Sequence, residues 1–95
     1  MSSLQIDFED GFEGDTVVVR ADGRELWRQE GVTTNAAISL AAIAQVEVPE
    51  SADLEVEILT RSLSATTRID TPYLEVEIVD DRLNVTPSAD LPPHL

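Results

Sequence analysis

The segment LEVEIL at residues 54–59 returns almost unchanged as LEVEIV at residues 74–79, and this repeated segment decides the fold class. In both copies an apolar residue occupies every second position, and a glutamate fills each gap. Successive side chains of a β-strand point to opposite faces, so each copy has one apolar face and one carboxylate face. A helix would distribute the same residues around its whole circumference. The alternation therefore predicts two half-buried strands.

Similar alternation along the rest of the chain predicts about seven or eight short strands in total. Asp22-Gly23 lies between two strand-like runs, and this dipeptide is typical of a type I′ turn, which needs a positive φ at both central residues. Over residues 38–48 the apolar side chains share one parity, which favours a strand, and an alanine-rich helix over residues 35–42 is the alternative. The other strands are expected at residues 4–8, 16–20, 24–30, 54–60, 63–69, 73–79 and 83–86.

Many short strands separated by turns predict an all-β fold, a small two-sheet antiparallel sandwich. Short turns in the C-terminal half predict a β-meander over residues 54–86, in which Arg68 on the middle strand relieves the repulsion between the two glutamate faces. This layout resembles immunoglobulin-like and prealbumin-like sandwiches, a likeness of fold that implies no particular function. Residues 1–86 are expected to form a single domain, and residues 87–95, with three prolines, a flexible tail.

The charge balance is strongly acidic. The 95 residues include 19 Asp and Glu against six Arg and no Lys, and the formal net charge is −13. Nucleic acids and anionic membranes would be repelled at range, so neither is expected as a partner. Such acidity is typical of a surface that resists aggregation, and it also fits a salty environment or an affinity for divalent cations.

Several kinds of catalytic group are missing from the chain. It has no cysteine, which removes disulfides, thiolate metal sites and cysteine nucleophiles. Its only histidine, His94, lies in the predicted tail, where nothing would hold a catalytic base in position. The N-terminal residues lack the basic and apolar segments of a signal peptide, so a cytoplasmic location is expected. The predicted function is therefore a non-enzymatic binding or assembly module.

An acidic segment supplies candidate calcium ligands. Asp7, Glu9, Asp10, Glu13 and Asp15 lie within nine residues, with two glycines among them. Calcium takes about six to eight oxygen ligands, often from one loop. The spacing does not follow the helix–loop–helix calcium pattern, so the signal rests on composition, and acidic clusters are expected by chance in such a chain. A calcium-dependent ligand- or carbohydrate-binding module is the alternative function, and no other cofactor is expected.

Trp27 and Tyr73 are the candidate ligand-binding residues. Strand parity places Trp27 on the side of Glu25 and Tyr73 on the side of Glu75, so both rings are expected to face outward. Two exposed rings could form a platform for a sugar, and packing under loops is the alternative. The last strand, residues 83–86, is expected at a sheet edge, where strand pairing would allow the chain to self-associate into a homo-oligomer.

Overall fold

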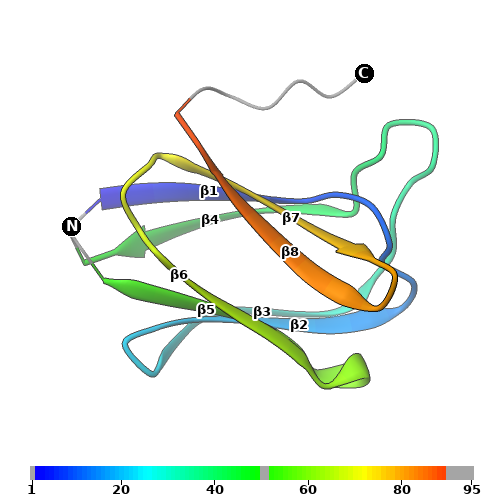
Figure 1. Cartoon of the computed structure of the whole chain (residues 1–95), viewed down its shortest axis with the longest axis horizontal. Helices are drawn as coiled ribbons and strands as arrows, with labels where there is room; N and C mark the ends of the chain where they lie inside the picture. Colours follow the sequence, from blue (N-terminus) through cyan, green and yellow to red (C-terminus); the bar gives the residue numbers. More distant parts are fainter. Residues whose placement is uncertain (1, 50–51, 90–95) are drawn as a thin grey trace.

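The computed structural model describes residues 2–49 and 52–89. Within these residues the chain forms eight strands, stacked in two layers (Figure 1), and one short 3₁₀ turn, η1 (Leu59–Arg61). The described part contains no helix of the length and apolar character needed to span a bilayer. The strands are β1 (Ser2–Phe8), β2 (Asp15–Ala21), β3 (Arg24–Val32), β4 (Ala42–Val48), β5 (Asp53–Ile58), β6 (Leu63–Arg68), β7 (Tyr73–Val79) and β8 (Arg82–Ser88).

The two layers are four-stranded sheets with the strand orders β4-β1-β7-β8 and β3-β2-β5-β6. This arrangement confirms the predicted all-β, two-sheet sandwich. One detail of that prediction is wrong, because β1 and β7 pair in parallel, whereas the other neighbouring strands are antiparallel. Hairpins join β2 to β3, β5 to β6 and β7 to β8 within a sheet, and the remaining connections cross between the layers.

The predicted meander over residues 54–86 is wrong. The two copies of the repeated segment lie in different sheets, because the chain crosses from β6 to β7 between the layers. Their glutamates therefore never share a surface, and Arg68 does not lie between them. Within the first copy, Arg20 on β2, the other neighbour of β5, pairs with both glutamates: its Nη1 donates to Glu55 at 3.0 Å and to Glu57 at 2.7 Å.

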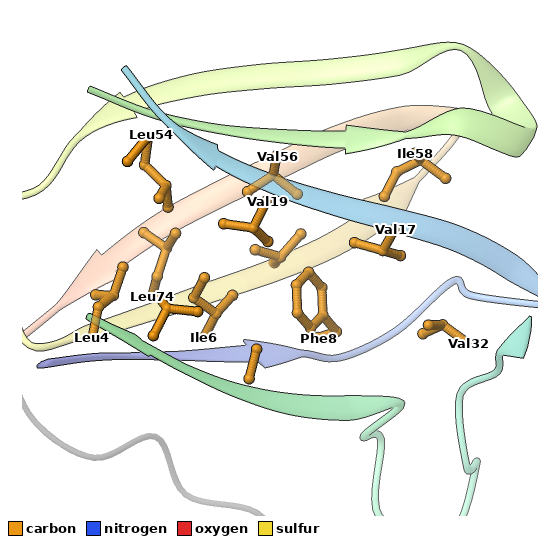
Figure 2. Packing of buried hydrophobic residues seen from close by; sticks show 14 of the residues in the cluster. Leu4, Ile6, Phe8, Val17, Val19, Val32, Leu54, Val56, Ile58 and Leu74 are labelled. Atoms are coloured by element: carbon orange, nitrogen blue, oxygen red, sulfur yellow. The ribbon is translucent and has the colours of Figure 1, made fainter. Parts of the chain in front are cut away.

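The core lies between the inner faces of the two sheets. Figure 2 shows apolar side chains of β1 and β7 pointing toward those of β2 and β5. Because alternate residues of each strand face inward, one row of apolar side chains from each strand is enough to fill the space between the layers. The largest fully buried side chains of this cluster are Leu4, Ile6, Phe8, Val17, Val19, Val32, Val48, Leu54, Val56, Ile58 and Val76.

The local turn predictions have mixed outcomes. Asp22 and Gly23 have φ values of 49° and 81°, which confirms the positive φ expected at both central residues of that hairpin. Residues 36–39 form a turn, closed by an isolated bridge between Asn35 and Leu40, so neither the helix over 35–42 nor a strand from residue 38 is correct. The strand begins only at Ala42. At the other end, β8 continues to Ser88, and the part of the predicted tail at residues 90–95 lies outside the described residues.

Replacing Asp81 with glycine is expected to stabilise the fold by about 0.5–1 kcal/mol. Asp80 and Asp81 form the turn between β7 and β8 with φ values of 51° and 58°, a conformation that glycine adopts without a steric penalty. Thermal unfolding should show a higher Tm for Asp81→Gly. Asp70→Gly is the matched control, because it removes the same charge from a loop residue that has no positive φ. An equal gain in both variants would attribute the effect to charge and contradict the prediction.

Candidate functional site

The acidic loop, residues 9–14, connects β1 to β2 and closes one end of the sandwich. Phe12 is buried and packs edge-on against Phe8, with ring centroids 5.8 Å apart and planes at 88°. Thr34 holds the loop from the opposite side: its Oγ1 donates to the Glu9 carbonyl at 2.6 Å and accepts from the Phe12 N–H at 3.0 Å. The Thr34 N–H donates to the Phe12 carbonyl at 2.9 Å. The loop is therefore packed against the sandwich, and hydrogen bonds from its backbone groups to Thr34 hold it there.

Asp15, directly after this loop, is buried and paired with Arg61 of η1. Arg61 Nε donates to Oδ1 and Nη2 to Oδ2, each at 3.0 Å, so the pair is bidentate. Thr60 Oγ1 donates to Oδ1 at 2.6 Å, and the Glu13 N–H donates to Oδ2 at 2.9 Å. Arg61 Nη2 also donates to the Gly11 carbonyl at 2.9 Å. The guanidinium thus binds both the carboxylate and a loop carbonyl, groups that would otherwise be ligands for a cation.

The surroundings of Asp15 keep it ionised. Burial alone would raise the pKa of this carboxyl, but the hydrogen bonds from Arg61, Thr60 and the Glu13 N–H, together with the positive charge of Arg61, lower the pKa below its ordinary value. The same pairing raises the pKa of Arg61. Because the folded-state pKa lies below the unfolded-state value of about 3.9, the pair stabilises the fold fully above that pH, and its contribution is lost as the pH falls.

The five candidate calcium ligands do not converge. Asp7 is buried, at 1% exposure, and accepts from Gln5 Nε2 at 2.9 Å, whereas Asp10 and Glu13 are exposed. In the described residues, no three of the His, Asp and Glu side chains are placed to hold one metal ion. The loop carbonyls are also engaged, for Asp10 O accepts from the Ile78 N–H at 2.9 Å. Calcium binding by these residues stays a prediction, and their arrangement does not favour it.

Trp27 faces the core, so its predicted outward orientation is wrong. It is opposite the buried Val19 and stacks on Phe8, with ring centroids 5.2 Å apart and planes at 11°. The register shifts between Val19 and Arg20, so that Glu25 pairs with Arg20 and no longer shares a face with Trp27. Such a β-bulge reverses the alternation that strand parity assumes.

Tyr73 lies apart from Trp27, in the other sheet. It is half-buried at the start of β7, beside Gln5 on β1, and Gln5 in turn lies beside Gln45 on β4. Gln45 Nε2 donates to Gln5 Oε1 at 3.3 Å. The structure therefore does not bring the two aromatic rings together as a platform, and ligand binding at Tyr73 stays a prediction.

A cavity of about 370 Å³ lies at the end of the sandwich where β6 crosses to β7. It is lined by Ser2, Ser3, Thr71 and Asp70, and by the apolar residues Ile69, Pro49 and Pro72. Thr71 Oγ1 already donates to the Tyr73 carbonyl at 3.0 Å. With one carboxylate and no second acid or base among these residues, the cavity does not offer the pair of groups that general acid–base catalysis uses.

The outer edge of β8 is a different kind of candidate site, made of backbone groups. On the neighbouring strand β7, Val76 O accepts from the Glu9 N–H at 2.7 Å, and the Ile78 N–H donates to Asp10 O at 2.9 Å. The backbone groups of Val76 and Ile78 therefore point toward β1 and away from β8. Their register partners on β8 are Val85 and Leu83.

In an antiparallel ladder, two residues that form a non-hydrogen-bonded pair both direct their N–H and C=O groups away from each other. Leu83 and Val85 accordingly direct these groups to the open side of the sheet. Pro87, opposite Leu74, occupies the next equivalent position, so its missing N–H costs the ladder with β7 no bond. The side chains of Leu83 and Val85 pack against the core. The edge thus combines available backbone groups with apolar side chains.

The four edge strands differ in how they discourage pairing. β3 carries Arg24, Glu25, Arg28 and Glu30 and two register irregularities, both of which protect an edge. β4 carries Glu47. β6 and β8 lie side by side across the two layers, and each has one charged residue, an arginine, and no carboxylate. Of these two edges without a carboxylate, β8 has two apolar side chains packed against the core, Leu83 and Val85, and β6 has one, Leu63.

No protein-family model matches this chain, and no curated protein or solved structure shows a significant match. The geometry is thus the basis for a functional proposal. The sequence placed the edge strand at residues 83–86 but missed Arg61 as the partner of Asp15. A buried aromatic residue inside an acidic loop, Phe12, was the available signal that the loop packs against the sandwich.

Proposed function

We propose that this protein is a non-enzymatic assembly module that takes up an additional β-strand at the edge of β8. The observation that carries the proposal is the outward direction of the backbone groups of Leu83 and Val85 on an edge strand that bears no carboxylate. An extended partner strand would gain main-chain hydrogen bonds there, and it would cover apolar side chains that are now only half-buried.

Three carboxylates that could serve as acids or bases are engaged in ion pairs, which favours a role in assembly over one in catalysis. Asp15 is neutralised by Arg61, and Glu55 and Glu57 are held by Arg20. These carboxylates are engaged in pairs that stabilise the fold, so they are not available as acids or bases.

Amide hydrogen exchange tests the proposal. In dilute protein at low salt, the amides of Leu83 and Val85 should exchange at least about tenfold faster than those of Asn84 and Thr86, whose N–H groups point toward β7. Binding of any strand at this edge should then slow Leu83 and Val85 selectively. Slow exchange at both residues in dilute protein would mean that the edge is already covered and would refute the proposal.

A further inference from the structure

We propose that the strand taken up at this edge is β8 of a second copy, paired antiparallel about a two-fold axis that passes at Asn84. This inference rests on the proposed function and adds the identity of the partner and the register. The two sandwiches would then share a continuous eight-stranded sheet, formed from the four strands β4-β1-β7-β8 of each copy.

Pro87 selects the register. With the axis at Asn84, Leu83 of each copy pairs with Val85 of the other, and both residues exchange N–H and C=O groups. With the axis at Val85, Leu83 would instead face Pro87, which has no N–H, and the Leu83 carbonyl would be left without a donor. The first register uses every outward N–H and C=O of Leu83 and Val85.

The side chains fit the same register. Leu83 and Val85 both face the inner side of the sheet, so each would pack against the other across the new interface and extend the core. On the outer face Asn84 of one copy would lie opposite Asn84 of the other, and Arg82 of each copy would lie opposite Thr86 of the other. No strand residue would bring two like charges opposite each other, and β6, in the adjoining layer, adds no carboxylate.

The charge of the whole chain predicts an unusual salt dependence. Two copies of net charge −13 repel each other at range, whereas the β8 interface itself contains no ion pair to be screened. Salt weakens the repulsion over the Debye length, about 8 Å at physiological ionic strength. Association should therefore strengthen as salt is added, the opposite of what an interface held by ion pairs would do.

Sedimentation equilibrium tests whether the partner is a second copy of this chain. Raising NaCl from about 0.05 M to about 1 M should move the average mass from 10.4 kDa toward twice that value. Asn84→Lys should weaken the dimer severalfold, because two like charges would face each other at the axis. Gln29→Lys on β3, the edge of the other sheet that is farthest from β6, changes the net charge equally at an exposed residue outside the interface, so it should leave the dimer intact. A monomer at every salt and protein concentration would overturn this inference.

Disulfide cross-linking tests the register in a chain that has no cysteine of its own. With the axis at Asn84, Asn84→Cys should cross-link with itself, and a mixture of Arg82→Cys and Thr86→Cys should cross-link between the variants. These positions form non-hydrogen-bonded pairs, whose Cα separation of about 4.5 Å suits a disulfide. Cross-linking of Asn84→Cys with Thr86→Cys, without the Asn84 self-pair, would place the axis at Val85 and overturn the register.

The outcomes distinguish the proposed function, strand addition at the edge of β8, from the further inference that the added strand is β8 of a second copy. Fast exchange at Leu83 and Val85 in a protein that stays monomeric would exclude the second copy and leave strand addition by another chain as the function. Slow exchange at these amides in dilute monomer would exclude both.

Discussion

Replacing Gly11 with alanine is expected to lower the free energy of unfolding by about 3 kcal/mol or more, the largest effect of any single methyl group in this protein. Gly11 has a φ of 94°, and a Cβ built there would overlap the carbonyl oxygen of Ile78. The obstacle is backbone, so no side-chain rotation relieves it. The acidic loop would have to move away from β7.

Movement of the loop would break several contacts at once. The hydrogen bond between Asp10 O and the Ile78 N–H holds the loop to β7, and the Gly11 carbonyl accepts from Arg61. Phe12, buried at 3% exposure beside Phe8, depends on both. Thermal unfolding of Gly11→Ala should therefore show a Tm lower by about 12 °C or more for a domain of this size.

Gly14→Ala is the matched control within the same loop. Gly14 also has a positive φ, 63°, but a Cβ there would meet no atom within 4 Å. That variant should cost only the conformational penalty, about 1 kcal/mol. If both variants lost the same stability, the close approach of Gly11 to Ile78 would not be the cause.

Replacing Arg61 with methionine should cost roughly 3 kcal/mol at pH 7. Methionine keeps much of the side-chain length but leaves the carboxylate of Asp15, whose side chain is 3% exposed, without its cation. Arg68→Met is the control, because Arg68 is 68% exposed and its Nε lies 3.9 Å from Asp53, and an exposed pair of that kind contributes at most about 1 kcal/mol. Urea unfolding measures both.

The pH dependence of this loss identifies its cause. In the native protein the Asp15 pKa is lowered, so acid removes the stabilisation that the pair contributes. In Arg61→Met burial should instead raise the Asp15 pKa, and protonation then favours the folded state. The stability difference between the two proteins should narrow as the pH falls from about 7 to about 3.

The double variant Asp15→Asn/Arg61→Met is the check on this interpretation. The loss that Arg61→Met causes in an Asp15→Asn background is the difference between Asp15→Asn and the double variant. It should not vary with pH, because neither protein has a carboxyl to titrate at residue 15. A difference that stays constant with pH in the single variant would show that Arg61 acts through packing and not through its charge on Asp15.

Strand pairing within hairpins could be predicted from the sequence, whereas the assignment of strands to sheets could not. The alternation in β5 and β7 is the same, so it places both as half-buried strands, yet nothing in it distinguishes a neighbour in the same sheet from one across the core. The connection through residues 69–72 crosses the layers, and β5 has β2 as its other neighbour. Arg20 lies opposite Glu55 and pairs with Glu55 and Glu57, whereas Arg68 lies opposite Asp53.

Some features of the candidate sites could likewise be predicted from the sequence, and others could not. The edge strand at β8 was predictable because it is the last run of alternating residues and ends near a proline. For the acidic loop, Phe12 was the one sequence signal of packing, because the same carboxylates and glycines suit either a metal site or a loop packed against the sandwich. A bulge at Val19 and Arg20 reversed the expected direction of Trp27, since one inserted residue shifts every later side chain to the other face.

The sequence by itself determined that the chain forms short strands around an aliphatic core, because side-chain direction along a strand is a local property with a period of two. Only the tertiary structure decided which carboxylates are neutralised and which edge stays open. Both depend on groups far apart in the chain. Arg61 reaches Asp15 across 46 residues, and the hydrogen bonds of β7 to Glu9 and Asp10 leave Leu83 and Val85 with backbone groups that point outward.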